Sequence, residues 1–131
     1  MKAKYISIPL LFFLILVATA LSCKSTTPTP EILVEKQFEV PPGGNTAEVV
    51  FNAKEGQRIR ISLQAKGDTV EPYGYLTFPD GNGDYFPKLE NQQDGKNTAE
   101  LTLPQTGAYT LAIMDGSNQG GLVEVKVEVL E

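Results

Sequence analysis

Hydrophobic and polar residues alternate along most of the chain after residue 30. The alternation is clearest near the carboxyl end, where apolar positions recur at every second residue in 101–103, 109–113 and 123–129. A period of two places alternate side chains on a buried and a solvated face of a β-strand. Between these runs, 104–107 and 115–121 carry the Gly and Asn residues that let an antiparallel chain reverse. The pattern predicts three strands separated by two turns.

Similar patterns predict five earlier strands, at 31–40, 47–51, 58–64, 72–78 and 84–88. Ile32, Val34, Phe38 and Val40 share one parity of the first strand, and Lys36 interrupts it, as is typical of an edge strand. The turn at 79–83 favours a hairpin, and 89–96 is expected to be a polar loop. About eight short strands predict an all-β fold, an antiparallel two-sheet β-sandwich.

The amino-acid composition excludes several classes of function but does not identify one. The 131 residues are 41% hydrophobic and 21% charged, which is typical of one globular domain. The chain has no His and a single Cys, which excludes His-ligated metals, His general bases and an internal disulfide, so we expect no enzyme. Without residues 1–22 the chain carries 9 basic and 16 acidic residues, a net charge of −7. Such a surface disfavours nucleic acid, whose phosphates need basic partners.

Residues 1–22 have the pattern of a secretory signal helix. A short basic start precedes an almost unbroken apolar run at 6–17, and the run ends in small residues. The segment Ala20-Leu21-Ser22-Cys23 resembles the bacterial lipoprotein lipobox, with Ala20 where Leu is commonest. The resemblance implies cleavage before Cys23 and a lipid on the Cys23 thiol.

We expect residues 23–30 to be a lipidated tether that holds the folded domain, 31–131, at a membrane. Residues 24–30 are polar and proline-bearing, a composition that does not form a packed core. The alternative is an uncleaved membrane helix, because the 17 residues of 5–21 are at the lower edge of the roughly 17–25 needed to cross a bilayer. The lipoprotein resemblance, with Lys24 in place of an acidic residue, favours the periplasmic leaflet of the outer membrane if the host has two membranes.

Three segments of the predicted sandwich share their order with a known domain family. Residues 53–61, 76–81 and 103–111 resemble the bacterial pre-peptidase C-terminal domain, a jelly-roll-like β-sandwich. The resemblance covers most of 38–130 and implies a module of the kind that accompanies secreted enzymes, although we expect no enzyme within these 131 residues. Tyr109 is similar to a tyrosine corner, whose hydroxyl ties a strand to a neighbouring connection.

Two pairs of residues form the candidate partner-binding site. Tyr73 and Tyr75 alternate with the apolar positions of their predicted strand, and Arg58 and Arg60 do so on another strand. If all four point outward, they form a Tyr/Arg patch, the composition enriched at recognition surfaces. We therefore predict that these residues bind an unknown envelope protein or a glycan.

Two short motifs indicate weaker sites. Asp80, Asn82 and Asp84 have the alternate oxygen spacing of a calcium loop, although Tyr85 and Asn91 replace the Gly and Glu of an EF-hand. The same residues are typical of a hairpin turn, so we expect no cofactor, with calcium as the open alternative. Residues 68–70, Asp-Thr-Val, resemble a short bacterial O-glycosylation sequon.

The leading function is a lipid-anchored envelope lipoprotein whose sandwich is a non-catalytic binding or structural module. Calcium-dependent adhesion is one alternative. A small hydrolase using paired carboxylates is the other, with Glu71, Asp94 and Asp115 as scattered acids; nothing in the sequence brings two of them together, and solvated acids at turns are the simpler interpretation.

Overall fold

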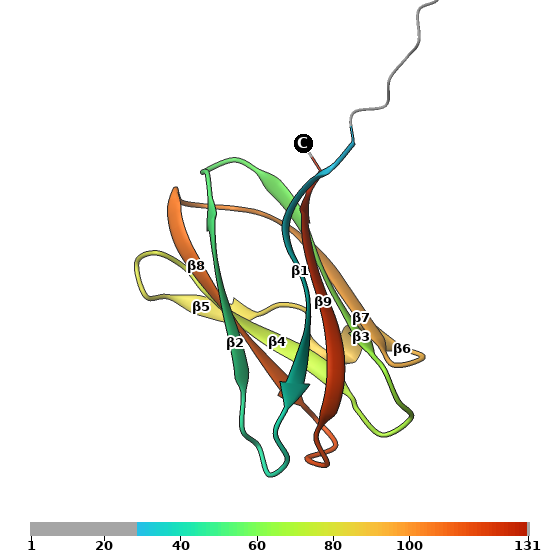
Figure 1. The fold of residues 1–131 in the computed structure, drawn as a ribbon. Coiled ribbons are helices and arrows are strands. Elements are labelled where there is room, and N and C mark those ends of the chain that lie inside the picture. The colour runs from blue at the N-terminus through green and yellow to red at the C-terminus, as the bar shows by residue number, and fades with distance from the viewer. Residues whose placement is uncertain (1–28, 131) are drawn as a thin grey trace, which may run out of the picture.

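The computed structural model describes residues 29–130, which form two antiparallel β-sheets packed face to face (Figure 1). The elements are β1 (Glu31–Val40), β2 (Ala47–Ala53), β3 (Arg58–Ala65), β4 (Pro72–Thr77), β5 (Gly83–Tyr85), the 3-10 turn η1 (Leu89–Asn91), β6 (Gln92–Gln93), β7 (Lys96–Thr102), β8 (Gly107–Asp115) and β9 (Gly121–Val129). The predicted signal segment, Cys23 and most of the tether lie outside the described residues. Within 29–130, no helix is long and apolar enough to cross a membrane.

Successive strands mostly alternate between the two sheets. One sheet has the order β1-β9-β3-β7-β6 and the other β2-β8-β4-β5, with every pairing antiparallel. This is a jelly-roll arrangement, and the predicted all-β sandwich is confirmed. The structure has nine strands rather than about eight because β6 lies in the predicted polar loop. Its two residues are too few to show alternation.

The core lies between the sheets and comes from the alternation that the sequence displays. Central strands β3, β8 and β9 supply its fully buried centre, formed by Ile59, Ile61, Leu63, Tyr109, Leu111, Ile113, Val123, Val125 and Val127. Burying each such aliphatic side chain stabilises the fold by roughly 1.5–3 kcal/mol. The outward residues of the same strands are therefore fixed on the two outer faces.

The first strand is an edge strand, as predicted, and Val34, Phe38 and Val40 face the core as expected, but Ile32 does not. A register shift between Ile32 and Val34 leaves Ile32 40% exposed and Leu33 partly buried against the core. The shift is a β-bulge, which moves one residue out of the alternation and cannot be seen in the pattern alone. Lys36 is exposed, with its ammonium 5.3 Å from the centre of the Phe38 ring.

Tyr109 forms the predicted tyrosine corner. Its hydroxyl donates to the Gln105 carbonyl at 2.5 Å and accepts from the Gln105 amide at 3.1 Å. The Tyr109 ring stacks on Phe51 at 5.7 Å and meets Phe78 edge-on at 5.9 Å. Burial raises the pKa of this tyrosine. Its role is structural because the ring is fully buried and the hydroxyl is used by the chain itself.

Asp115 fixes the connection between β8 and β9. Its carboxylate accepts hydrogen bonds from the backbone amides of Glu71, Ser117 and Gly120 and from the Ser117 hydroxyl. Burial alone would raise the pKa of Asp115, but the Ser117 hydroxyl and these amides outweigh it and lower the pKa to about 2. The expectation of a solvated turn acid is wrong here, since Asp115 is 5% exposed and its oxygens are engaged.

Candidate functional site

The two predicted binding pairs lie on opposite sides of the sandwich. Arg58 and Arg60 belong to β3 of the five-stranded sheet, whereas Tyr73 and Tyr75 belong to β4 of the four-stranded sheet. All four point away from the core, so the predicted parity is correct. The single Tyr/Arg patch is nevertheless wrong, because parity does not reveal which sheet a strand joins. Each pair must be considered with its own neighbours.

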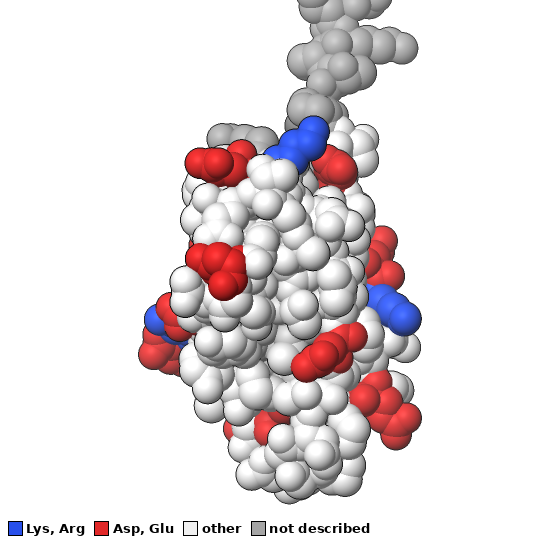
Figure 2. All heavy atoms as spheres, turned by 90° about the vertical axis from the view of Figure 1, so that its left-hand side faces the viewer, with Lys and Arg blue, Asp and Glu red and all other residues white. Residues whose placement is uncertain are grey.

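The outer face of the four-stranded sheet is almost free of charge. Tyr75 lies opposite both Ala112 and Tyr85, and Tyr73 lies opposite Met114. We call this surface the tyrosine face; its outward residues are Glu48, Val50, Asn52, Tyr73, Tyr75, Thr77, Tyr85, Ala108, Thr110, Ala112 and Met114. Among these side chains only Glu48 is charged. Figure 2 shows this side as a mostly uncharged surface with isolated charged groups.

Three tyrosines form a cluster on this face. The Tyr85 ring lies 5.0 Å from Tyr75, nearly perpendicular to it, and 6.0 Å from Tyr73, measured between ring centres. Tyr85 is 46% exposed although it contacts both neighbours. It was not among the predicted site residues, since its side of the short strand β5 depends on the hairpin register. That register places Thr77 opposite Gly83 and so sets Tyr85 beside Tyr75.

A cavity of about 360 Å³ opens beside this cluster, within the size range of small-ligand sites. It is lined by Tyr73, Asp84, Tyr85, Lys88, Leu89 and Glu90. The two rings and Leu89 provide apolar contact surface, and the other three side chains provide two acceptors and one donor. Leu89 is itself 45% exposed, so the apolar part of the wall is open to a ligand.

Gly74 lets the chain pass closely behind the cavity. Its amide donates to the Pro87 carbonyl at 3.1 Å, and the Phe86 amide donates to the Gly74 carbonyl at 2.8 Å. A Cβ at position 74 would lie 2.7 Å from the Phe86 carbonyl oxygen and 2.8 Å from Leu111 Cδ1. Glycine is required because no larger residue allows this approach.

Asn97 of β7 holds the same segment from inside the fold. Its side-chain amide donates to the Lys88 carbonyl at 2.7 Å and to the Pro72 carbonyl at 3.1 Å. Asn97 is fully buried, so these bonds compensate for much of the cost of burying its amide. The residue positions the backbone of the cavity wall. Its sequence signal is a polar residue on the inward parity of β7.

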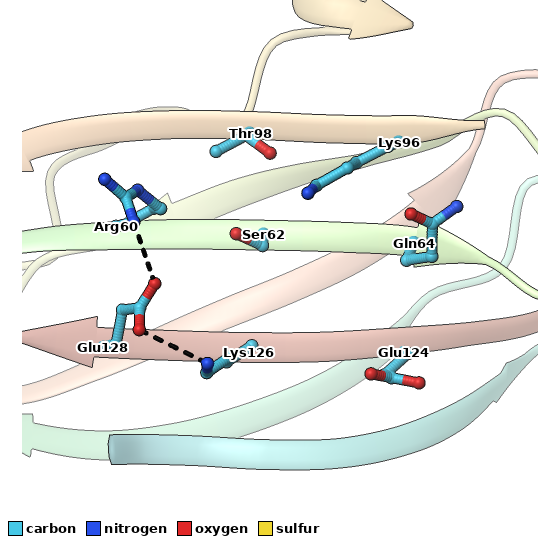
Figure 3. Close-up of a pocket in the computed structure, with 8 residues that line it drawn as sticks. All are labelled: Arg60, Ser62, Gln64, Lys96, Thr98, Glu124, Lys126 and Glu128. Carbon is cyan, nitrogen blue, oxygen red and sulfur yellow. Dashed lines mark hydrogen bonds and ion pairs between the residues drawn. The ribbon is translucent and has the colours of Figure 1, made fainter. Parts of the chain in front are cut away.

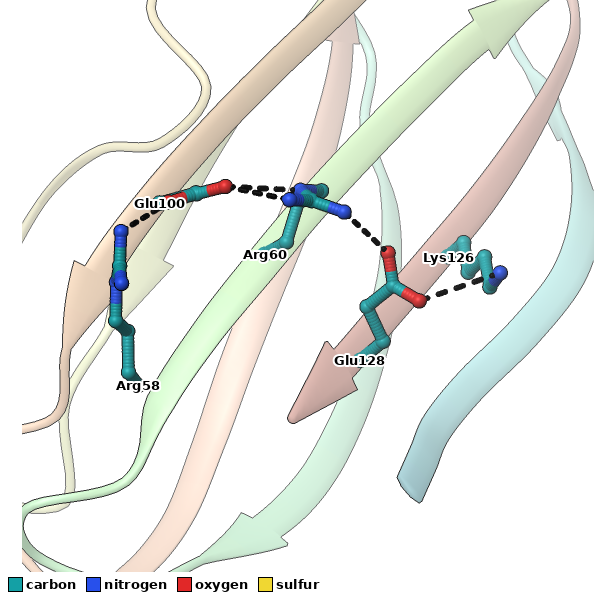
Figure 4. A network of polar contacts seen from close by, with 5 residues as sticks. All are labelled: Arg58, Arg60, Glu100, Lys126 and Glu128. Atoms are coloured by element: carbon teal, nitrogen blue, oxygen red, sulfur yellow. Dashed lines mark hydrogen bonds and ion pairs between the residues drawn. The ribbon is translucent and has the colours of Figure 1, made fainter. Parts of the chain in front are cut away.

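The outer face of the five-stranded sheet has the opposite character. We call it the charged face; its central residues are Arg58, Arg60, Ser62, Gln64, Lys96, Thr98, Glu100, Glu124, Lys126 and Glu128. Three ion pairs cross its strands, from Arg58 to Glu100 (2.6 Å), Glu100 to Arg60 (2.7 Å) and Arg60 to Glu128 (3.2 Å), and a fourth joins Glu128 to Lys126 (3.3 Å) along β9 (Figure 4).

The ion pairs engage both predicted arginines within the protein. The hydrogen bond from Arg60 lowers the pKa of Glu100, and the same bond raises the pKa of Arg60. Glu128 is mostly buried and uses both carboxylate oxygens, one for Arg60 and one for Lys126. Each guanidinium therefore reaches a partner only in competition with carboxylates of its own sheet.

The predicted calcium residues use their side-chain oxygens in hydrogen bonds within the protein. The Asp80 carboxylate accepts from the Asn82 amide and side chain, both at 2.9 Å, and from the Gln105 side chain at 2.6 Å. The bond from Gln105 contributes most to lowering the pKa of Asp80. One Asp84 oxygen accepts from the Tyr85 amide at 2.7 Å. In the part of the chain described, no group of three or more His, Cys, Asp or Glu side chains could hold a metal; calcium binding stays a prediction.

The predicted glycosylation segment lies in the connection between β3 and β4. Asp68 and Thr69 are exposed there, whereas the Val70 side chain is buried in the core. A hydroxyl at Thr69 is thus accessible, and modification of it stays a prediction. Glu71 and Asp94 are also exposed, and neither joins a cluster of acids among residues 29–130.

The sequence matches no known family profile, and no curated protein matches it significantly. Solved structures do match. The pre-peptidase C-terminal domain of a Bacillus anthracis collagenase is similar over 73% of this chain and 89% of that domain, with 18% identity and a TM-score of 0.59. The periplasmic g-type lysozyme inhibitor PliG of Salmonella Typhimurium is similar over 73% of this chain and 89% of that protein, with 20% identity and a TM-score of 0.52.

A third structure, PliG of Aeromonas hydrophila, has 18% identity and a TM-score of 0.46, covering 73% of this chain and 81% of that protein. Sequence identity is low throughout, so the likeness is one of fold. The sandwich of this chain is therefore similar to that of a pre-peptidase C-terminal domain, as the three sequence segments predicted.

Proposed function

We propose that the chain is a non-catalytic binding module of the bacterial cell envelope, and that the tyrosine face holds its partner. One observation carries the proposal: Tyr73, Tyr75 and Tyr85 cluster on an exposed sheet face where ten of the eleven outward residues are uncharged. Aromatic side chains contribute disproportionately to binding because they bury large areas at a small entropic cost. An uncharged surface also loses little hydration free energy when it is covered.

A protein is the leading partner class. Val50 is 61% exposed on the same face and extends the apolar surface beyond the tyrosine cluster. A broad surface of this kind suits a protein better than a small molecule. The Salmonella protein of the same fold is an inhibitor of g-type lysozyme, and this is in keeping with a protein partner.

A glycan is the second candidate, favoured by the cavity beside Tyr85. Sugar rings present apolar C–H faces and a rim of hydroxyl groups. The Tyr73 and Tyr85 rings offer a surface for the former, and the carboxylates of Asp84 and Glu90 offer acceptors for the latter. An oligosaccharide would occupy this cavity and leave Val50 uncovered.

The test is capture from an envelope extract with matched variants. We expect wild type to retain a partner that the double variant Tyr75→Ser/Tyr85→Ser does not, while both give the same thermal unfolding curve within a few degrees. The control is Lys66→Ser/Glu124→Ser, which removes an exposed ion pair of the five-stranded sheet and should capture normally. Equal capture by the tyrosine variant would contradict the proposal. Loss of capture by the control alone would move the site to the other face.

The two partner classes separate in the same experiment. A protein partner is retained after glycosidase treatment of the extract and is weakened by Val50→Asp, which adds a charge at the far side of the face. Binding of a glycan should not change with Val50→Asp but should be lost with Glu90→Gln, because Glu90 lines the cavity and Val50 does not.

We also propose that a lipid on Cys23 anchors the module, in the periplasmic leaflet of an outer membrane where the host has one. The lipobox-like segment supports the anchor, and two acyl chains suffice for stable membrane attachment. The mass of the detergent-extracted protein tests this. A chain that starts at Cys23 and carries acyl mass is the expected result; a chain with Met1 and no added mass contradicts it.

A further inference from the structure

A hollow of about 350 Å³ crosses the charged face over β7, β3 and β9 (Figure 3). Its floor is formed by Ser62 and Thr98, which lie directly opposite each other on β3 and β7. These side chains are short, whereas the next outward residues of both strands are long. Arg60 stands on one side of the floor and Gln64 on the other, so the hollow is built into the cross-strand rows.

One positive charge at this hollow, that of Lys96, has no ion-pair partner among residues 29–130. Arg60 and Lys126 pair with Glu128, and Glu124 pairs with Lys66 at 2.5 Å. The Lys96 ammonium has no ion-pair or hydrogen-bond partner among residues 29–130, nor do the hydroxyls of Ser62 and Thr98. In Figure 3 the Lys96 side chain points along the strands toward these two hydroxyls. Three hydrogen-bond donors thus lie around one hollow with no acceptor from the described chain.

A second hollow of about 470 Å³ shares Gln64, Lys96 and Thr98 with the first and continues toward β6 and η1. Its remaining lining residues are Asn91, Gln93 and Asp94. Every side chain that lines the two hollows is polar, and neither contains an aromatic ring or an aliphatic side chain. The groove therefore suits a ligand that is hydrogen-bonding along its whole length.

We propose that this groove binds an acidic saccharide, with one sugar carboxylate held by Lys96, Ser62 and Thr98. The unpaired ammonium supplies the single positive charge that a carboxylate requires, and the hydroxyls donate to its oxygens. The amide side chains of Gln64, Asn91 and Gln93 then both donate to and accept from the sugar hydroxyls. Each side chain that lines the groove ends in a polar group, so a saccharide can form hydrogen bonds along its whole length, whereas a peptide would place its apolar side chains beside these groups.

This site is independent of the tyrosine face, and a calorimetric titration tests it. The full-length protein in detergent is titrated with tri-D-galacturonate, with the neutral trisaccharide cellotriose, and with inorganic phosphate. We expect the acidic trisaccharide to bind with millimolar or tighter affinity and the other two to bind at least about tenfold more weakly. Lys96→Gln should weaken trigalacturonate binding about tenfold, the effect of losing one charge-assisted hydrogen bond.

Two control variants separate this site from others. Lys54→Gln removes an exposed lysine remote from the groove, in the turn after β2, and should bind like wild type. Trigalacturonate binding that remains in Tyr75→Ser/Tyr85→Ser belongs to the groove and not to the cavity beside Tyr85, so a failure of the tyrosine face leaves this result intact. Ser62→Ala should weaken binding without altering the charge.

Several results would overturn the proposal. No heat from trigalacturonate up to about 10 mM would do so, as would equal affinity in Lys96→Gln and wild type. Equal binding of cellotriose would remove the role of the carboxylate. Equal affinity for phosphate would mean that the groove binds any anion. A peptide that competes through its terminal carboxylate with equal affinity would mean that the ligand is a peptide and not a saccharide.

Discussion

The two outer faces of this sandwich both arise from the alternation of side chains along β-strands. They differ in whether their outward side chains have partners within the protein. On the charged face, Arg60 reaches carboxylates on both neighbouring strands, so most charged groups near it have partners within the chain. On the tyrosine face, Tyr85 contacts Tyr73 and Tyr75 and is still 46% exposed. The difference teaches that the side chains of a charged face can pair mostly with one another. An uncharged face can instead leave aromatic rings exposed for a binding partner.

The free energies expected from ion pairs and from tyrosines differ in the same direction. Exposed ion pairs contribute only about 0–1 kcal/mol each because water and salt screen them. A tyrosine at the centre of an interface can contribute about 2 kcal/mol or more, since its ring is removed from water. Net binding free energy is therefore expected mainly from the tyrosine face, with the groove at Ser62 as a local exception on the charged face.

The largest expected effect concerns Tyr85 itself. With the captured partner purified, Tyr85→Ser should weaken binding about 100-fold, or roughly 3 kcal/mol, because the ring is the most exposed of the cluster. Tyr85→Phe keeps the ring and should lose less than about tenfold. Surface plasmon resonance measures both. Equal losses for Ser and Phe would show that the hydroxyl, not the ring, provides the contact.

The largest acid sensitivity of stability should come from Asp115 at the end of β8, since its pKa is lowered to about 2 and Asp115 is more deeply buried than Glu100 of the charged face. The pKa of Asp115 is about 2 in the folded protein against 3.8 for an ordinary aspartate, so the stabilisation is complete above about pH 4 and is lost as the pH falls toward 2. The shift corresponds to about 2 kcal/mol of unfolding free energy. Urea unfolding of wild type between pH 5 and 2 should show this loss.

Asp115→Asn should be about 2 kcal/mol less stable than wild type at pH 7 and should lose that part of the acid dependence. Asp68→Asn is the matched control, an exposed aspartate in the connection before Glu71. It should unfold like wild type at every pH. A pH profile unchanged by Asp115→Asn would mean that the buried carboxylate does not set the acid sensitivity.

A smaller effect separates ion pairs within the charged face. Arg60→Gln leaves the mostly buried Glu128 with Lys126 alone and should lower the unfolding free energy by about 1 kcal/mol. Lys66→Gln breaks an exposed pair with Glu124 and should have no measurable effect in the same urea titration. Similar losses for both would mean that burial of Glu128 does not matter.

The smallest expected effect is that of salt on the two faces. Raising the ionic strength from 0.05 to about 1 M shortens the screening length to about 3 Å and should slightly weaken the network around Arg60. Binding at the tyrosine face should hardly change, because it involves few charges. Partner affinity measured across this range checks the claim, and a steep decrease would indicate that charged residues dominate the interface.

Strand positions and facing directions could be predicted because alternation is a local property. Residues such as Ile61 and Val125 reveal their buried side through their neighbours in sequence. Assignment to a sheet is not local, since in this jelly-roll order β3 pairs with β7 and β9 while β4 pairs with β8. The predicted Tyr/Arg patch failed for this reason.

The remaining site residues depend on contacts between distant segments. Tyr85 joins the cluster only through the hairpin register, and Asn97 matters because it reaches the Lys88 carbonyl from another strand. Asp115 resembles an ordinary turn acid in sequence, yet the fold brings the Glu71 amide to it across 44 residues. Short polar residues at such positions carry little sequence signal, since the same types also favour solvated turns.

The most direct test of the tyrosine face is hydroxyl-radical footprinting of the protein with and without its captured partner. The method reports side-chain exposure, and both faces carry reactive residues. We predict that the partner protects Tyr85 and Met114 and leaves Leu122, which is 48% exposed on the outer side of β9, fully reactive. Protection of Leu122 with Tyr85 and Met114 unchanged would contradict the account.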